Sequence, residues 1–427
     1  GVSSAGLVLA TGAATSTPAH AARVATKARI AIAGSGLAGL ALAHRLTKLL
    51  DGARITVIDA KEEHNYQPGY TLVATGVWPV GKVVDQNADF MPAGMEWVKD
   101  MVAEFDPAAN AVVTAGGQRI AYDYLIVAVG THQDWAQIEG MDVSAIGQNG
   151  LTSVYPSASA AVATWAAMDA FCKKGGKAVM TLPSSALKCA GAPLKMAFML
   201  RDRLAQGGRL KQSEVMFYSA LGNVFSVKSV NDNVLERWSN LGIALHTHQT
   251  LQAIDIGGRR AIFASPDGGK TEVDYDFLHA VPPMRAPDAV KNSDLAWKEG
   301  PMAAGGWLEV DKATLQHRRY PNVFGLGDIN GTPRGKTAAT VKKSAPIVAQ
   351  HVVDVIAGRA PSQQFDGYTS CPMIVREGSA MLIEFDYDGK LTPSLPMIEP
   401  LQESYFAWLM KVWMLKPAYL ATLKGRV

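Results

Sequence analysis

The 427-residue chain is short of cysteine, of long hydrophobic runs and of clustered basic charge. Only three cysteines occur (Cys172, Cys189 and Cys371), without the paired spacing of a disulfide scaffold or a zinc site, so we expect no metal. No run approaches about 20 uninterrupted apolar residues, which argues against a membrane-spanning helix. The net charge is +3 without a basic stripe, so we expect no nucleic-acid partner. What remains is a globular chain, 48% hydrophobic, with room for two or three domains.

The first residues, GVSSAGLVLATGAATSTPAHA, do not read as part of a fold. They are small and weakly apolar and end in Ala19-His20-Ala21, a pattern typical of an export signal and its cleavage site. A disordered arm is the alternative. Residues 1–27 are therefore predicted to be a leader or an arm. An export signal predicts the periplasmic side of a bacterial inner membrane, with the mitochondrial inner membrane or the cytoplasmic face as alternatives.

Residues 29–59 carry the pattern of a dinucleotide-binding unit. A short apolar run (29–33) precedes GSGLAG (34–39), an apolar-periodic helix follows (40–50), and a second run ends at Asp59. Gly34 permits the tight turn, Gly36 lets the backbone approach a pyrophosphate, and Gly39 allows the helix to pack closely on the strand. Asp59 follows Gly39 by 20 residues, where an acid accepts a ribose hydroxyl. This order predicts a Rossmann-like domain.

Two later apolar strands favour FAD as the dinucleotide. Residues 121–130 end in Gly130, and residues 320–328 end in Gly327-Asp328. Both resemble the returning segments of flavoproteins with two dinucleotide-binding domains, in which the second aspartate holds the ribityl and phosphate region of the flavin. Taken singly, each segment also fits an ordinary buried strand.

A second dinucleotide-like domain is predicted to open with a strand at 177–183, but no glycine cradle for NAD follows it. The chain reads PSSALKCAGAP (183–193) instead, and Pro193 suits the first turn of a helix over 194–204. Cys189 thus precedes a helix N-terminus, where the helix dipole, Lys188 and Lys195 favour a thiolate. We infer that electrons come from a substrate that engages a thiol, not from NADH.

Cys371, in DGYTSCP (366–372), is the second candidate for a reactive thiol. Like Cys189, it lies in a segment rich in Gly, Pro, Ser and Thr, not in an apolar periodic run. Pro372 biases it toward an extended conformation, compatible with a fixed position in a turn. A small buried hydrophobe is the alternative for any cysteine, and Cys172, near a predicted helix end, is expected to be one.

The C-terminal residues 403–426 combine aromatic and apolar side chains with lysines. Pro417 is predicted to divide them into two short helices that rest in a membrane interface. The alternative is a helix packed on the protein's own core or on a partner subunit. The residues that suggest a membrane are Tyr405, Trp408, Leu409, Met410, Trp413, Met414, Leu415 and Tyr419, with Lys411, Lys416, Lys424 and Arg426 between them.

Eight segments together resemble those of sulfide:quinone oxidoreductase, and they are most similar to its type II, mitochondrial-like branch. The similarity runs in order over nearly the whole chain after about residue 28, and Cys172 matches none of that family's active-site cysteines. The segments are GSGLAG (34–39), YQPGYTL (66–72), LKCAGAPLK (187–195), PPM (282–284), LQHRRYPNVFGLGD (315–328), GKTAA (335–339), DGYTSCP (366–372) and IEFDY (383–387).

The resemblance implies FAD as the cofactor, with Cys189 and Cys371 as a redox pair on the substrate face of the flavin. Hydrogen sulfide would attack Cys371 and release Cys189 as a thiolate against the flavin C4a, while Lys195 stabilises the anions. Electrons would pass to quinone, and the sulfur to a small acceptor such as sulfide, sulfite, cyanide or a thiol. Lys336 and Thr337 would meet the pyrimidine edge of the flavin. A solvated loop lysine is the alternative for Lys336.

The predicted architecture is α/β, with two Rossmann-like domains and a C-terminal amphipathic segment at a membrane surface. Residues 28–150 and 275–365 form the FAD domain, residues 151–274 a second domain without NAD, and residues 366–427 the region of Cys371 and membrane association. Two rival functions stay open: a flavocytochrome c sulfide dehydrogenase subunit that reduces a cytochrome, and a non-catalytic flavin and thiol redox sensor. A homo-oligomer also stays open.

Overall fold

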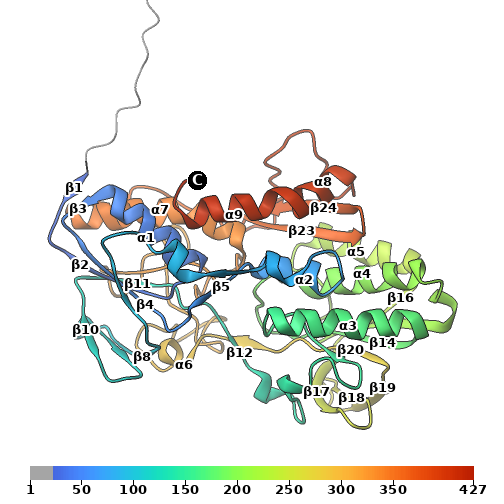
Figure 1. Ribbon diagram of the computed structural model, residues 1–427. Coiled ribbons are helices and arrows are strands. Elements are labelled where there is room, and N and C mark those ends of the chain that lie inside the picture. The colour runs from blue at the N-terminus through green and yellow to red at the C-terminus, as the bar shows by residue number, and fades with distance from the viewer. Residues whose placement is uncertain (1–22) are drawn as a thin grey trace, which may run out of the picture.

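The computed structural model describes residues 23–427 (Figure 1). The predicted cleavage site at 19–21 lies outside the described residues. Residues 23–27 already belong to the fold, because β1 (Val24–Ala25) pairs in parallel with β3 (Leu50–Asp51) and Arg23 Nε donates to Leu50 O at 3.0 Å. The prediction of a leader or arm is therefore wrong for residues 23–27.

The first domain is built on a five-stranded parallel sheet, as the dinucleotide pattern predicts. Its central strands carry fully buried isoleucines such as Ile32, as expected for a parallel sheet that is covered on both faces. Helices α1 (Leu37–Leu49) and α7 (Ala338–Ile356) pack against each other on this sheet. The strand order is β22 (Val323–Gly325), β11 (Tyr124–Val127), β2 (Arg29–Ala33), β4 (Arg54–Ile58) and β7 (Glu96–Val98).

The second domain repeats this arrangement with another five-stranded parallel sheet. Its strand order is β13 (Leu151–Thr152), β20 (Phe277–His279), β14 (Gly176–Leu182), β15 (Ser213–Ser219) and β16 (Ile243–His246). Helices α3 (Ala158–Lys174), α4 (Ala192–Gln206) and α5 (Lys228–Leu241) belong to it. The predicted boundary at 274 is too early, because β20 still pairs in this sheet.

The two domains are joined by a short pair of strands, β12 (His132–Gln133) and β21 (Met284–Arg285). Arg285 Nε there lies 3.0 Å from Asp134 Oδ2, and both side chains are mostly buried. The remaining small elements are β5 (Glu63–Asn65), α2 (Tyr70–Val73), β6 (Val84–Gln86), β8 (Val102–Asp106), β9 (Ala111–Thr114), β10 (Arg119–Ala121), β17 (Thr250–Asp255), β18 (Arg260–Ala264), β19 (Lys270–Asp274) and α6 (Asp288–Lys291).

The C-terminal region lies across both domains (Figure 1). A hairpin of β23 (Thr369–Arg376) and β24 (Ser379–Phe385) is followed by α8 (Tyr405–Leu409), a π-helical turn over 410–414 and α9 (Leu415–Leu423). Helix α8 packs on β24, and α9 packs on α1. Two short α-helices are present as predicted, but the π-helical turn separates them, and Pro417 lies in the first turn of α9, where a proline is tolerated. Within residues 23–427, no helix is long and apolar enough to cross a membrane.

We predict that Trp238→Ala lowers the free energy of unfolding by about 3–5 kcal/mol. Trp238 is 1% exposed and packs between Phe198 and Phe217, with ring centroids 5.9 and 4.6 Å away, so truncation leaves a cavity. Urea denaturation followed by circular dichroism measures the change. Trp413→Ala, which truncates an exposed indole, is the control and changes stability by less than about 0.5 kcal/mol. Equal losses in the two variants would contradict the prediction.

Candidate active site

The GSGLAG loop has the geometry that its glycines predict. Gly34 has a φ of +111°, and a Cβ at this position would lie 2.2 Å from Ala128 O. A Cβ at Gly39 would lie 1.9 Å from Gly34 O, so only glycine lets α1 approach this closely. A Cβ at Gly36 would meet nothing within 4 Å, so the loop backbone faces open space there. An anionic group can therefore reach the loop and the N-terminus of α1.

Asp59 lies directly beside this loop, at the end of β4. Its Oδ2 accepts hydrogen bonds from Ser35 N at 2.8 Å and from Ser35 Oγ at 3.0 Å, and its Oδ1 accepts one from Lys61 N at 3.0 Å. The carboxylate is thus held in one orientation. This is the position from which an acid accepts a ribose hydroxyl.

Gly130, Gly327 and Asp328 follow the neighbouring strands β11 and β22. Gly130 has a φ of +71° and open space around a Cβ, whereas a Cβ at Gly327 would lie 2.9 Å from Ala38 Cβ, beside the start of α1. Burial raises the pKa of the Asp328 carboxyl, although the charges of Lys336 and Lys188 oppose the rise. Within residues 23–427, no group donates a hydrogen bond to this carboxylate, so it is available to a ligand. The open cradle, the oriented Asp59 and this carboxylate fit a bound dinucleotide.

Lys336 is buried, so the solvated-loop alternative is wrong. Its Nζ donates to Asp328 O at 2.7 Å and to Asn330 O at 2.9 Å, and lies 3.7 Å from the ring centroid of Trp307. Burial lowers the pKa of Lys336 to about 7. The two hydrogen bonds from its Nζ hold the turn that carries Asp328.

Thr337 caps the N-terminus of α7. Its Oγ1 accepts from Thr340 N at 3.2 Å and lies 2.8 Å from Thr369 Oγ1. Because Thr369 begins β23, this contact connects α7 to the strand that carries Cys371. Thr337 thus helps to place the second candidate cysteine.

Cys189 lies in the loop between β14 and α4, as the sequence predicts, and has a left-handed backbone with a φ of +51°. Such a conformation costs about 1–2 kcal/mol for a residue other than glycine. It is stabilised by hydrogen bonds from Cys189 N to Lys336 O at 2.9 Å and from Tyr155 Oη to Cys189 O at 3.3 Å. Tyr155 was not singled out from the sequence. A strained backbone that its surroundings hold in place is typical of functional sites.

Cys371 is in strand β23, not in the turn that the sequence predicts, although its backbone is extended as expected. Its side chain points at the N-terminus of α4, because a Cβ on Gly191 would lie 2.2 Å from Cys371 Sγ. Burial raises the pKa of the Cys371 thiol, and the charges of Lys195 and Lys411 act against that rise. Both candidate cysteines therefore meet at the start of one helix.

Lys195 lies beside the candidate thiols. Its Nζ is 3.7 Å from Cys189 Sγ, although its side chain is only 2% exposed. Burial opposes the charged ammonium, but the two sulfurs more than offset this effect and the pKa of Lys195 is raised. The structure thus brings Cys189, Cys371 and Lys195 together.

Lys411 is a second buried ammonium that sequence reasoning missed, because it was assigned to a membrane surface. It lies on the π-helical turn, is 1% exposed, and its Nζ donates to Pro68 O at 2.7 Å. Burial, together with the nearby charge of Lys195, lowers the pKa of Lys411 to about 7, while Cys189 and Cys371 oppose the fall. The sequence gives no signal for it, because Lys411 shares a helix face with Ala407 and Trp408 and only the structure shows that this face is buried.

Cys172 is buried in α3, which confirms the expectation of a structural role. Its side chain is 6% exposed, and burial raises the pKa of the thiol to about 12. It is not part of the cluster around Lys195.

The aromatic tail presents two different faces. Tyr405, Phe406, Trp413 and Met414 are each more than half exposed. We name these four residues the exposed patch. The prediction that the other tail aromatics also face a membrane is wrong for Trp408 and Tyr419, which are buried.

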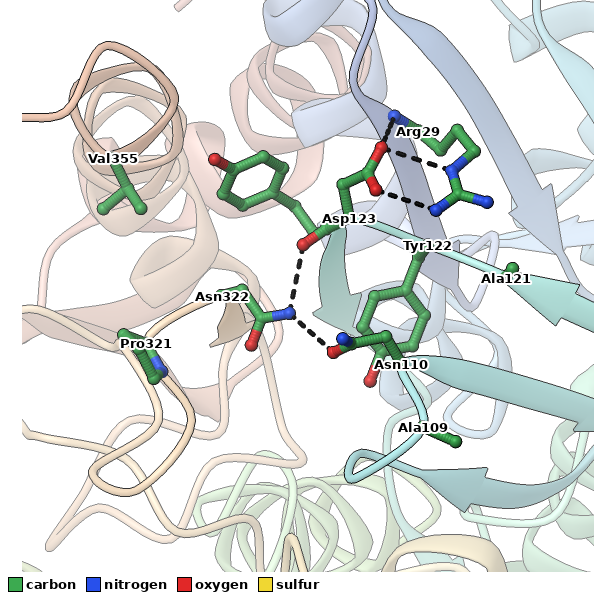
Figure 2. A pocket seen from close by; sticks show the side chains of 10 residues that line it. Arg29, Ala109, Asn110, Ala121, Tyr122, Asp123, Pro321, Asn322 and Val355 are labelled. Carbon is green, nitrogen blue, oxygen red and sulfur yellow. Dashed lines mark hydrogen bonds and ion pairs between the residues drawn. The ribbon is translucent and has the colours of Figure 1, made fainter.

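A separate pocket of about 400 Å³ lies at the opposite end of the first sheet (Figure 2). Arg29 and Asp123 form an ion pair at 2.8 Å in it, and Asn322 Nδ2 donates to Asn110 Oδ1 at 2.9 Å (Figure 2). These residues lie where strands β2, β11 and β22 begin, whereas ligands of this fold class bind beyond the carboxyl ends of the strands. The pocket is therefore not part of the candidate active site.

Comparisons with known proteins agree with this geometry. The profile of the pyridine nucleotide-disulphide oxidoreductase family matches residues 28–173. The chain is 36% identical over 400 residues to the mitochondrial sulfide:quinone oxidoreductase of Dictyostelium discoideum, covering 93% of this chain and 86% of the relative. It is 33% identical over 396 residues to the mitochondrial sulfide:quinone oxidoreductase of Mus musculus, covering 91% and 85%.

A solved structure shares the fold. The X-ray structure of the sulfide:quinone oxidoreductase from Aquifex aeolicus has a TM-score of 0.75 at 20% identity, covering 93% of this chain and 92% of that one. The two curated relatives are both named as mitochondrial, so the comparisons give no support to the periplasmic location predicted from the first residues.

We predict that Lys411→Met slows alkylation of the dithiothreitol-reduced thiols of Cys189 and Cys371 roughly tenfold below pH 7. Lys411 carries its charge below its pKa of about 7 and favours the thiolates only there, so the difference from wild type disappears as the pH rises above 7. Iodoacetamide labelling followed by mass spectrometry resolves each cysteine. Lys416→Met is the matched control, because Lys416 pairs with Asp85 at 3.3 Å instead. Parallel wild-type and variant profiles at every pH would contradict the prediction.

Proposed function

Because the chain belongs to the sulfide:quinone oxidoreductase family of flavoproteins, which oxidise sulfide and pass the electrons to quinone, we propose that Cys189 and Cys371 are its redox pair. The observation that carries this proposal is that both sulfurs lie at the start of α4, where the buried Lys195 ammonium contacts Cys189 Sγ and Cys371 Sγ lies against Gly191. Neither a cytochrome-reducing subunit nor a non-catalytic sensor is favoured by the relatives.

The sulfur step is a disulfide exchange. In the oxidised protein the two sulfurs form a disulfide, and HS⁻ attacks Cys371 Sγ. The bond that breaks leaves a persulfide on Cys371 and a thiolate on Cys189, so no external oxidant is needed for this step. Lys195 and the N-terminus of α4 stabilise the departing thiolate, which lowers the barrier to attack. The persulfide sulfur then passes to a small acceptor.

The backbone around Cys189 keeps its sulfur in place during this exchange. The left-handed conformation at Cys189 is held by Lys336 O on one side and by Tyr155 Oη on the other. A thiolate that does not move needs little reorganisation before it reacts.

FAD is the cofactor that the first domain fits. Gly34 and Gly36 would let its pyrophosphate approach the start of α1, Asp59 would accept a ribose hydroxyl, and Asp328 would accept hydrogen bonds from the ribityl region. When bound, FAD would take two electrons as the Cys189 and Cys371 thiols re-form their disulfide, and would pass them to quinone. Lys336 supports this site indirectly, by holding the turn before Asp328.

The exposed patch is proposed to rest on a membrane surface, from which quinone reaches the flavin. Its aromatic and apolar side chains lie beside Lys82, whose Nζ is 5.1 Å from the Trp413 ring, an arrangement typical of an interfacial segment. The mitochondrial relatives support an inner-membrane location.

We predict that Cys189→Ser and Cys371→Ser each abolish flavin reduction by sulfide while FAD stays bound, because the exchange needs both sulfurs. Anaerobic titration of the purified protein with sulfide, followed by loss of flavin absorbance, measures this. Cys172→Ser is the control and retains reduction, since Cys172 lies outside the cluster. Loss of reduction in Cys172→Ser, or its survival in either of the other variants, would mean that the pair is wrongly chosen.

We also predict that the double variant Phe406→Ser and Trp413→Ser binds vesicles of phosphatidylcholine and cardiolipin at least about 100-fold more weakly, because each lost side chain removes roughly 1.5–3 kcal/mol of apolar burial. Vesicle sedimentation measures the bound fraction. Met101→Ser, which changes an apolar residue of similar exposure outside the tail, keeps wild-type binding. Unchanged binding of the double variant would exclude this patch as the membrane contact.

A further inference from the structure

A chain of hydrogen bonds connects the C-terminal helix α9 to the dinucleotide loop. Tyr419 Oη lies 2.7 Å from His64 Nε2, and His64 Nδ1 lies 2.8 Å from Asn87 Oδ1. Asn87 Nδ2 donates to Ser35 Oγ at 2.8 Å, and Ser35 Oγ donates to Asp59 Oδ2 at 3.0 Å. Four consecutive bonds thus join the tail to the acid that faces the ribose position. We name this series the Tyr419–Asp59 chain.

The donor and the acceptor of each hydrogen bond in the Tyr419–Asp59 chain can be assigned, starting from the Asn87 amide. Asn87 Nδ2 also donates to Lys61 O at 2.7 Å, and a carbonyl can only accept, so the Asn87 amide has one orientation. Its Oδ1 must then accept from His64 Nδ1. Burial lowers the pKa of His64, which keeps the ring neutral, so His64 Nε2 carries no proton and accepts from Tyr419 Oη. All donors therefore point toward Asp59.

None of the four donor residues can find water in place of its partner. Tyr419, His64, Asn87 and Ser35 are at most 8% exposed. A buried donor or acceptor that loses its partner keeps the full cost of desolvation, so the members of such a network are ordered together or not at all. The position of helix α9 and the orientation of the Asp59 carboxylate consequently depend on each other, although the two lie far apart along the chain.

We propose that Tyr419 is a positioning residue for the dinucleotide site, through which the seating of the C-terminal helix orients Asp59 for a ribose hydroxyl. Binding of the dinucleotide in turn holds α9 against the first domain, because coupling between two binding events is reciprocal. This inference rests on the proposed function only for the identity of the dinucleotide, FAD.

The first test is the affinity for FAD. Tyr419→Phe keeps the ring and removes only the hydroxyl, so we expect FAD to dissociate from the purified full chain about tenfold more readily, in the range typical of coupled sites. Recovery of flavin fluorescence on dilution measures dissociation. Tyr275→Phe is the matched control, because Tyr275 is a buried tyrosine near β20 whose hydroxyl has no hydrogen-bond partner among residues 23–427, and it keeps the wild-type affinity. Wild-type affinity in Tyr419→Phe would overturn the inference.

The second test measures how firmly helix α9 is held against the first domain. We expect trypsin to cleave after Lys424 more slowly when FAD is bound to the wild-type chain. Tyr419→Phe reduces this protection by the same factor by which it weakens FAD binding. Lys416→Met, which removes a different anchor of α9 (the ion pair with Asp85), speeds cleavage with and without FAD alike. Protection by FAD that is the same in wild type and Tyr419→Phe would overturn the inference.

A double-mutant cycle keeps the inference testable even if Tyr419→Phe is poorly folded. Ser35→Ala breaks the Tyr419–Asp59 chain at its other end, while Ser35 N still donates to Asp59. This single variant is therefore expected to weaken FAD binding and to speed trypsin cleavage after Lys424. The double variant then loses little more than Ser35→Ala, because the chain is already broken. Additive losses would overturn the inference. A wild-type chain that binds no FAD would instead overturn the proposed function.

Discussion

The candidate site depends on one electrostatic arrangement, a buried ammonium between two sulfur atoms. A lysine as deeply buried as Lys195 is costly unless a partner compensates its charge, and here the partners are the thiols of Cys189 and Cys371. The dependence is mutual. The thiols are also removed from solvent, so they need a nearby cation to ionise to thiolates. The N-terminus of α4 and Lys411 add positive potential at the same place.

The C-terminal region has two roles that use opposite faces. Its buried face completes the first domain, with Lys411 bonded to Pro68 O and Tyr419 bonded to His64. Its outer face carries the exposed patch. A π-helical turn over 410–414 lies where these roles meet, and such turns are frequent at functional sites because they redirect side chains within one helix. The tail is therefore part of the site as well as a candidate membrane contact.

Sequence patterns located the elements that depend on local chemistry. The glycines of GSGLAG, the strand that ends before Asp59 and the helix that begins around Pro193 are where the patterns predict them. The errors share a different cause. Cys371 was expected in a turn, yet its flanking segment finds a partner strand, β24, which local composition does not reveal. The second domain was ended too early, because the pairing of β20 with β13 and β14 joins segments far apart along the chain.

The sequence by itself determined where the loops can turn, because glycine permits backbone dihedral angles that other residues avoid and proline fixes its own φ. It also determined that the second domain lacks a glycine cradle and carries a cysteine there. Only the tertiary structure decided which face of the tail is buried, because both faces carry aromatic and basic residues and periodicity alone cannot rank them. It likewise decided the partners of Lys336, Lys411 and Tyr419, since the atoms that bond to a buried polar group come from whichever distant segments pack against it.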